Sequence, residues 1–95
     1  MIQYNTLQTE EVLDLLDLHN SEEEQARGIA LASQLEDFSA FLQPVNERHN
    51  KNVWDNCAAM LAAKTDEQLS PFATELFEWT ADLNWPGAVT ILERI

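Results

Sequence analysis

The chain has 95 residues, enough for one domain with a hydrophobic core and too few for two. Seventeen Asp and Glu against five Lys and Arg give a formal net charge of −12, which disfavours nucleic-acid binding because such binding needs cations that neutralise phosphates. No apolar run approaches the ~20 residues of a membrane span and no signal peptide is evident, so we expect a cytoplasmic protein with no membrane contact.

The acidic residues are concentrated in the first half of the chain. Residues 1–47 contain ten acidic groups and a single basic one, Arg27, whereas residues 48–95 contain seven acidic and four basic groups. Carboxylates at this density repel nucleic acid and attract basic proteins by electrostatic steering. We therefore expect a basic protein partner and no direct contact with nucleic acid.

The first two predicted elements are amphipathic helices. Thr9 is the predicted N-cap of a helix that extends to about Leu18. Ser21 and Glu24 have the spacing of a capping box, which predicts a second helix from there to about Leu35. Acidic residues share one side of the first helix, at positions i, i+4 and i+7, and fill the first turn of the second. These residues are Glu10, Asp14, Asp17, Glu22, Glu23 and Glu24.

The middle of the chain is predicted to contain a short turn, a loop and a third helix. Asp37 is suited to cap a short turn that Pro44 ends, and the polar residues 45–51 form the longest loop. Asn52 is the predicted N-cap of a helix that continues to about Ala63.

A bent or broken helix is predicted for residues 66–83. Thr65 and Gln68 form a second capping box, and Ser70 followed by Pro71 gives another helix start inside the same segment. The residues expected on its inner face are Leu69, Phe72, Leu76, Trp79 and Leu83.

Proline after Trp85 predicts a corner followed by a last helix. Pro86 disfavours helical geometry in the residue before it and suits the first helical position. Val89, Leu92 and Ile95 are the residues of this helix that we expect in the core. All three tryptophans are predicted to pack in the core, with Trp85 the best candidate for partial exposure.

Three segments carry a recognisable sequence motif. They are residues 52–58, residues 64–69 and the corner at residues 78–88, whose sequence is Glu-Trp-Thr-Ala-Asp-Leu-Asn-Trp-Pro-Gly-Ala. In these segments the chain resembles a family of short bacterial HEAT-like helical proteins of uncharacterised function. The resemblance covers about the last three quarters of the chain. It implies a helical fold and supplies no catalytic residue set.

The two capping boxes also indicate an internal repeat. They are offset by 44 residues, within the ~40–47 spacing of HEAT and armadillo repeats. We therefore predict an all-α, single-domain protein, residues 1–95, built as a HEAT/armadillo-like stack of antiparallel helix pairs. A plain orthogonal helix bundle is the alternative.

Residues suited to catalysis or metal binding do not form a known pattern. His19 and His49 fall in predicted loops, where we expect them to be solvated, and neither has the spacing of a metal site. Cys57 is the only cysteine, which excludes an internal disulfide, and its apolar surroundings predict a buried core residue. We expect no enzyme activity, catalytic residue, metal or cofactor.

A small acidic helical protein without a catalytic site is suited to binding another protein. The first hypothesis is an immunity protein that neutralises a basic bacterial toxin domain, such as a nuclease, through the six carboxylates named above. The alternative is a HEAT-like adaptor or scaffold that binds a peptide or protein in a helical groove, which an apolar groove near Phe72 and Trp85 would favour. An enzyme or metal protein is a third class that nothing in the spacing supports.

Overall fold

Helices are the only regular elements in the computed structural model, which describes residues 2–35, 37–46 and 49–95, with side chains from Thr9 onward. No strand is present in these residues, so the all-α prediction is confirmed. With η marking a 3-10 helix, the elements are α1 (Ile2–Leu15), α2 (Glu22–Ala32), η1 (Ser39–Phe41), α3 (Lys51–Ala62), α4 (Asp66–Leu69), η2 (Ser70–Phe72), α5 (Ala73–Trp79) and α6 (Ala88–Arg94).

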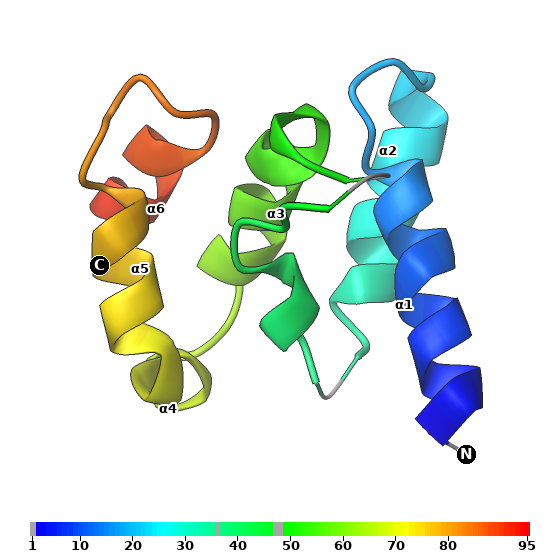
Figure 1. Ribbon diagram of the computed structural model, residues 1–95, viewed down its shortest axis with the longest axis horizontal. Coiled ribbons are helices and arrows are strands. Elements are labelled where there is room, and N and C mark those ends of the chain that lie inside the picture. The colour runs from blue at the N-terminus through cyan, green and yellow to red at the C-terminus, as the bar shows by residue number, and fades with distance from the viewer. Residues whose placement is uncertain (1, 36, 47–48) are drawn as a thin grey trace.

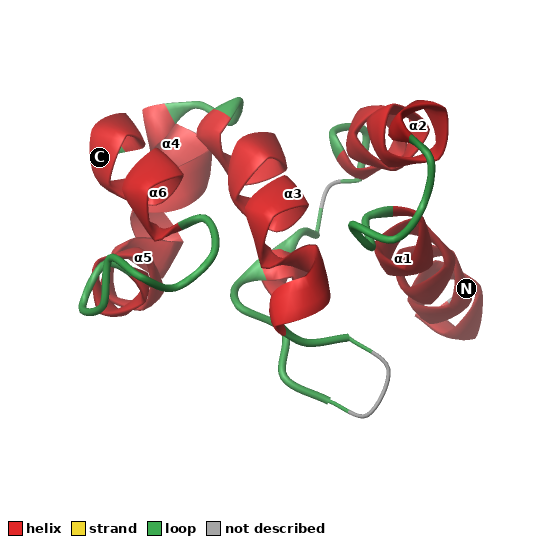
Figure 2. Cartoon of the chain, turned by 90° about the horizontal axis from the view of Figure 1, so that it is seen from above, coloured by secondary structure: helices red, strands yellow, loops and turns green. Residues whose placement is uncertain are grey.

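The helix α3 lies in the middle of the molecule, between the α1–α2 pair and the helices α4 to α6 (Figure 1). The view from above shows the same order (Figure 2). On one side α3 packs against α2 and η1 and on the other against α6, while α1 packs against α2 and α5 against α6. Chain neighbours pack together in the pairs α1–α2, α2–α3 and α5–α6, whereas α3 and α6 pack although α4 and α5 separate them in the chain. The HEAT-like form of the stacking stays a prediction.

Both predicted capping boxes are present. The Ser21 hydroxyl accepts the N–H of Glu24 at 3.2 Å, and the Thr65 hydroxyl accepts the N–H of Gln68 at 3.1 Å. In each pair the second side chain also accepts the backbone N–H of the cap residue. A capping box satisfies N–H groups that have no partner within the helix, which is why local sequence decides these starts.

Two other predicted helix starts are wrong. The helix α1 begins at Ile2, so Thr9 lies inside it, because no glycine or proline in the preceding residues interrupts the helix. The helix α3 begins at Lys51 with Asn50 as its cap, whose Oδ1 accepts the Lys51 N–H at 2.9 Å. The predicted cap, Asn52, turns its amide toward the α1–α2 connection instead.

The segment from α4 to α5 forms one broken helix, as predicted. Pro71 has no N–H to bond the carbonyl of Glu67, and the Ser70 hydroxyl contacts that carbonyl at 3.4 Å, so the break falls at η2. The helix ends at Trp79, and Leu83 beyond it is half exposed, so its predicted place on the inner face is wrong. The remaining predicted inner residues, Leu69, Phe72, Leu76 and Trp79, belong to the core or pack against it.

Three tryptophans form an aromatic cluster in the core. Trp54 makes edge-to-face contacts with Trp79 and Trp85, and both pairs have ring centroids 6.0 Å apart. Trp54 and Trp79 are buried and Trp85 is partly buried, in agreement with the prediction. The two buried indole N–H groups are satisfied, since Trp54 donates to the Pro44 carbonyl at 2.8 Å and Trp79 to the Pro86 carbonyl at 3.0 Å.

Gly87 closes the predicted corner between the last two helices. Its φ of 82° lies in the left-handed region, and an added Cβ would lie 2.7 Å from the Ala58 Cβ and 2.8 Å from the Trp54 carbonyl oxygen. The helix α3 therefore packs directly on the backbone of the corner. Gly87 is also the N-cap of α6, so the last helix begins at Ala88 and not at the predicted Pro86.

The helix α6 turns a different face to the core from the one predicted. Ala88 and Ile91 are buried, whereas Val89, Leu92 and Ile95 are about half exposed. Successive helical residues are rotated by ~100°, so a shift of one residue exchanges one face for another. The close contact at the corner decides which face is inward, because it holds the start of α6 against α3.

A second close approach joins α1 and α2 at Gly28. An added Cβ there would lie 2.8 Å from the Leu15 Cβ and 2.9 Å from the Leu16 Cδ2. The glycine is therefore explained by the lack of space between the two helices.

Replacing Gly87 with alanine is expected to lower the free energy of unfolding by about 2–4 kcal/mol, because left-handed strain and overpacking against α3 add. Urea unfolding followed by tryptophan fluorescence measures this loss. Thr90→Ala, an exposed change in the same helix, is the control and should stay within about 0.5 kcal/mol of the parent. Equal stability of Gly87→Ala and the control would contradict the close packing.

Candidate functional site

The six carboxylates predicted to bind a partner lie along α1 and at one end of the α1–α2 pair. Glu10 and Asp14 belong to α1, Asp17 lies in the short connection, and residues 22–24 begin α2. The connection and the start of α2 lie at the same end of the pair (Figure 1). Glu10 and residues 22–24 are exposed, whereas Asp14 and Asp17 are half-buried.

Asp14 is bonded to a buried histidine. Its Oδ1 lies 2.7 Å from Nε2 of His49, which is only 3% exposed, so the prediction of a solvated His49 is wrong. The His49 backbone also exchanges two hydrogen bonds with Asn46, donating to its Oδ1 at 2.8 Å and accepting its N–H at 2.9 Å. The residues before α3 are thereby held against α1, which removes His49 from water.

Asp17 organises the connection between α1 and α2. One carboxylate oxygen accepts the His19 N–H at 2.9 Å and lies 2.7 Å from the ring Nδ1 of the exposed His19. The other oxygen accepts the Asn52 amide at 2.9 Å. The backbone N–H and then the ring of His19 are the main reasons that the pKa of Asp17 lies below its ordinary value.

A row of polar contacts, called the polar seam below, joins the α1–α2 pair to Asn52 and Asn56 of α3. The Leu18 N–H donates to the Asn52 carbonyl at 3.1 Å. The Asn56 amide donates to the Leu16 carbonyl at 2.8 Å and to Gln25 Oε1 at 3.0 Å. Hydrogen bonds are directional, so the seam fixes the orientation of the pair relative to α3.

Two of the five basic residues are bonded to helix ends. Lys64, which is buried, donates to the Ser33 carbonyl at the end of α2 at 3.0 Å. Arg94 donates to the carbonyls of Ala62 and Lys64 at 2.9 and 2.7 Å and forms an ion pair with Asp66 at 2.8 Å. Cations at helix C-termini complement the helix dipole. The carbonyls at these helix ends therefore hold both cations in place, and Arg94 is also paired with a carboxylate.

Glu22 and Glu23 are the predicted site residues best placed to meet a partner. Both are exposed in the first turn of α2, where carboxylates complement the helix dipole. Glu24 beside them completes the capping box, and Asp14 and Asp17 hold the connections described above. Three of the six predicted residues therefore have structural roles, of which the sequence pattern revealed only that of Glu24.

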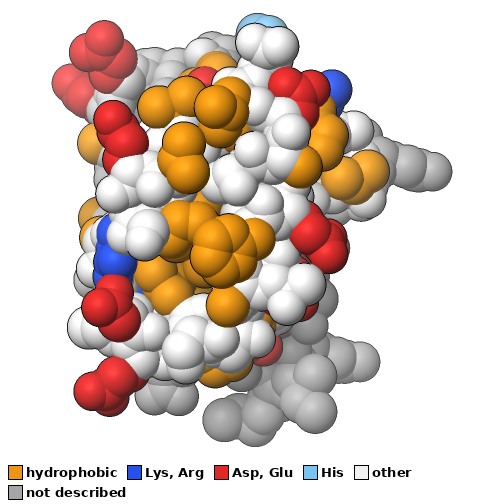
Figure 3. Space-filling model, turned by 90° about the vertical axis from the view of Figure 1, so that its left-hand side faces the viewer, with side chains coloured by type: hydrophobic (Ala, Val, Ile, Leu, Met, Phe, Trp, Pro, Cys, Tyr) orange, Lys and Arg blue, Asp and Glu red, His pale blue; other side chains and the backbone are white. Residues whose placement is uncertain are grey.

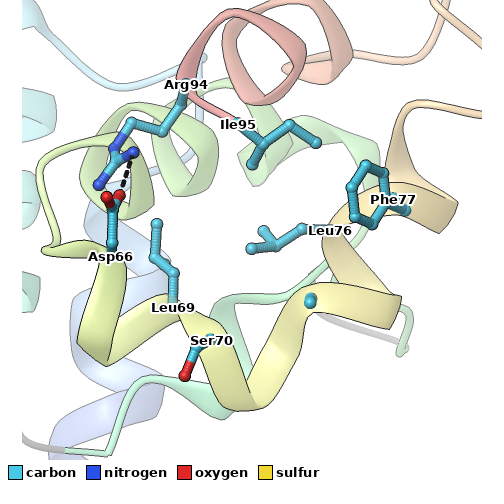
Figure 4. Close-up of a pocket in the computed structure, with 8 residues that line it drawn as sticks. Asp66, Leu69, Ser70, Leu76, Phe77, Arg94 and Ile95 are labelled. Atoms are coloured by element: carbon cyan, nitrogen blue, oxygen red, sulfur yellow. Dashed lines mark ion pairs between the residues drawn. The ribbon is translucent and has the colours of Figure 1, made fainter.

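A pocket of about 240 Å³ opens at the other end of the molecule, between α4, α5 and α6 (Figure 4). Its apolar lining includes Leu69, Leu76, Phe77 and Ile95, and the Asp66–Arg94 ion pair closes one side. Phe77 and Ile95 remain 64% and 47% exposed. The apolar spacing of α6 was the sequence signal for this surface, but it was assigned to the core.

Groups able to do chemistry are few in the described part of the chain. In residues 2–35, 37–46 and 49–95, no three His, Cys, Asp or Glu side chains lie close enough to hold a metal ion. Cys57 is buried, which raises the pKa of its thiol to about 12. None of the described helices is long and apolar enough to cross a membrane.

The second half of the chain matches a known family model. A domain of unknown function, DUF5071, matches residues 48–95, just over half of the chain. The chain belongs to the DUF5071 family. The matched segment contains the tryptophan cluster, the Gly87 corner and the pocket, whereas α1 and α2 precede it. No curated protein and no solved structure matches the chain.

The Asp14–His49 contact is expected to stabilise the fold, which a double-mutant cycle measures. Asp14→Ala and His49→Ala should each lower the free energy of unfolding. The double variant should lose about 1 kcal/mol less than the sum of the two single losses, because either change alone already breaks the hydrogen bond. Urea unfolding of the four proteins gives this coupling. Glu11→Ala, an exposed change on α1, is the control. Strict additivity of the two changes would contradict the contact.

Cys57 is expected to make stability fall at alkaline pH. Its thiol ionises near the ordinary value of 9.0 in the unfolded chain and near 12 in the folded one, so above pH 9 the unfolded state releases the proton first and gains stability. The parent should lose on the order of 1 kcal/mol more than Cys57→Ala between pH 8 and pH 10. Urea unfolding at both pH values tests this, and parallel losses would contradict it.

Proposed function

We propose that the protein is a non-catalytic protein-binding module, and specifically an acidic immunity protein that binds and neutralises a basic bacterial toxin domain. The supporting observation is the net charge of −12 on a molecule in which Lys64 and Arg94 are engaged with helix ends. The exposed carboxylates Glu22 and Glu23 face solvent, and Arg27 in the same helix is the one basic residue among residues 1–47.

A nuclease domain is the first candidate among such toxins. Its active cleft holds phosphate and is therefore basic, so carboxylates offered to the cleft replace the substrate's negative charge. Complementary charge accelerates the encounter and excludes acidic competitors, which suits a protein that must intercept a toxin quickly. Glu10 extends the proposed contact surface along α1, and Asp14, Asp17 and Glu24 support it from within.

An adaptor that binds a peptide in a helical groove is the second candidate. The pocket between α4, α5 and α6 favours it, because exposed apolar side chains border a concave site there. This groove differs from the one expected near Trp85, whose ring packs against Trp54 in the core. The two candidates thus use opposite ends of the molecule.

Charge reversal at the start of α2 tests the first candidate. The test co-expresses the protein with the toxin domain that is encoded beside its gene, and measures bacterial growth. The double variant Glu22→Lys with Glu23→Lys should protect growth much less than the parent does. Its circular dichroism spectrum should remain helical, since exposed changes cost about 0.5 kcal/mol each. The association rate should also fall steeply with ionic strength.

A matched pair, Glu78→Lys with Glu93→Lys, changes the net charge equally on α5 and α6, and should reduce protection less than the Glu22 and Glu23 pair does. Loss of protection in this pair alone would move the contact to the other end of the molecule. Full protection by both pairs, together with salt-insensitive association, would refute the electrostatic mechanism.

A further inference from the structure

Most of the exposed large apolar side chains lie at one end of the molecule. Among the described side chains, four of the seven are on or between α5 and α6, and a fifth, Ile95, directly follows α6. Figure 3 shows apolar side chains gathered in the middle of this side around a hollow, with carboxylates spread around them. Phe77, Val89, Leu92 and Ile95 are called the apolar face below.

The helix α6 and the residue after it supply an apolar stripe of this face. Val89, Leu92 and Ile95 follow at i, i+3 and i+6, so their side chains form a row that winds by about 120° around the helix over roughly 9 Å, and Ile95 lies just beyond the end of α6. The neighbouring side, with Ala88 and Ile91, is already buried against the core. Val89 and Leu92 therefore lie outside the side of α6 that the fold covers, and Ile95 continues their row past the end of the helix.

The pocket is of the size for a side chain. Its volume of about 240 Å³ is below the ~300–1,000 Å³ of small-molecule sites, and it opens between Phe77 and Ile95 (Figure 4). Leu69 and Leu76 line it more deeply, where they are 5% and 3% exposed. A bulky apolar side chain of a partner would contact these apolar side chains there, as an interface anchor does in its pocket.

The charge around the apolar face selects a basic occupant. Residues 66–95 contain six carboxylates and one cation, Arg94, which is paired with Asp66. A second copy of the chain would bring another −12 to this face and be repelled. A segment with an apolar stripe flanked by Lys and Arg would bury its stripe on the apolar face, and its cations would be attracted by the surrounding carboxylates.

On the proposed function of a protein-binding module, we propose that the apolar face docks an amphipathic helix with basic flanks from the partner protein. The helix lies along the stripe of α6, and one apolar side chain enters the pocket between Phe77 and Ile95. Anchors at i, i+3 or i+4 and i+7 on such a helix match a stripe of this length. This surface is separate from the carboxylates at the start of α2.

A fluorescein-labelled model peptide tests the docking by fluorescence anisotropy at about 0.15 M salt. The probe is an amphipathic helix with a leucine stripe and lysine flanks. Two control peptides are a scrambled one of the same composition, which has no stripe, and one with glutamate in place of lysine. The amphipathic basic peptide should bind, and both control peptides should bind roughly tenfold or more weakly.

Surface variants then locate the peptide. Phe77→Ala with Ile95→Ala should weaken binding roughly tenfold or more, and Glu78→Lys with Glu93→Lys should weaken it too. Glu22→Lys with Glu23→Lys should bind as the parent does. All positions are exposed, so folding should persist, and Leu92→Ala is a milder substitute if the first pair melts.

Three results would overturn the proposal. Equal binding of the scrambled peptide, or loss of binding only in the Glu22 and Glu23 variant, would show that charge alone captures the peptide. A dimer in sedimentation equilibrium that Phe77→Ala with Ile95→Ala abolishes would show that a second copy covers the face. Absence of peptide binding together with intact toxin protection would refute this docking and leave the proposed function standing.

Discussion

The structure of the second half depends on the contact between α3 and the backbone at Gly87. Because no side chain is present there, Ala58 and the backbone of Trp54 can touch the corner. The rings of Trp54 and Trp79 then meet edge to face, and the Pro86 carbonyl accepts the indole N–H of Trp79. This contact also fixes the rotation of α6, and with it the set of apolar residues that stay outside.

Features decided by neighbouring residues were predictable from the sequence, and features decided by distant ones were not. The all-α class, the capping boxes at Ser21 and Thr65 and the break at Pro71 each follow from a few adjacent residues. The inward face of α6 does not, because its pattern offers two apolar sides and only the packing on α3 chooses between them. Leu83 was misplaced because α5 ends at Trp79.

The candidate site divides in the same way. Periodicity correctly placed Glu10 on the exposed side of α1, and the capping box correctly placed exposed carboxylates at the start of α2, but neither pattern could find the partners of the half-buried Asp14 and Asp17. His49 and Asn52 each lie 35 residues further along the chain. The hydrogen bonds of Lys64 and Arg94 to helix ends likewise span about 30 residues. The sequence therefore did not reveal that these two cations are bonded within the fold. Whether any of the carboxylates contacts a partner stays a prediction.

The polar seam has a consequence for how strongly one partner can be held. Asn52 and Asn56 set a fixed orientation between the α1–α2 pair and α3, and the Gly87 corner sets the orientation of α6 on α3. The acidic end and the apolar end thus keep a constant separation. If one partner reaches both, its second contact forms at high effective concentration, and two weak surfaces combine into tight binding through avidity.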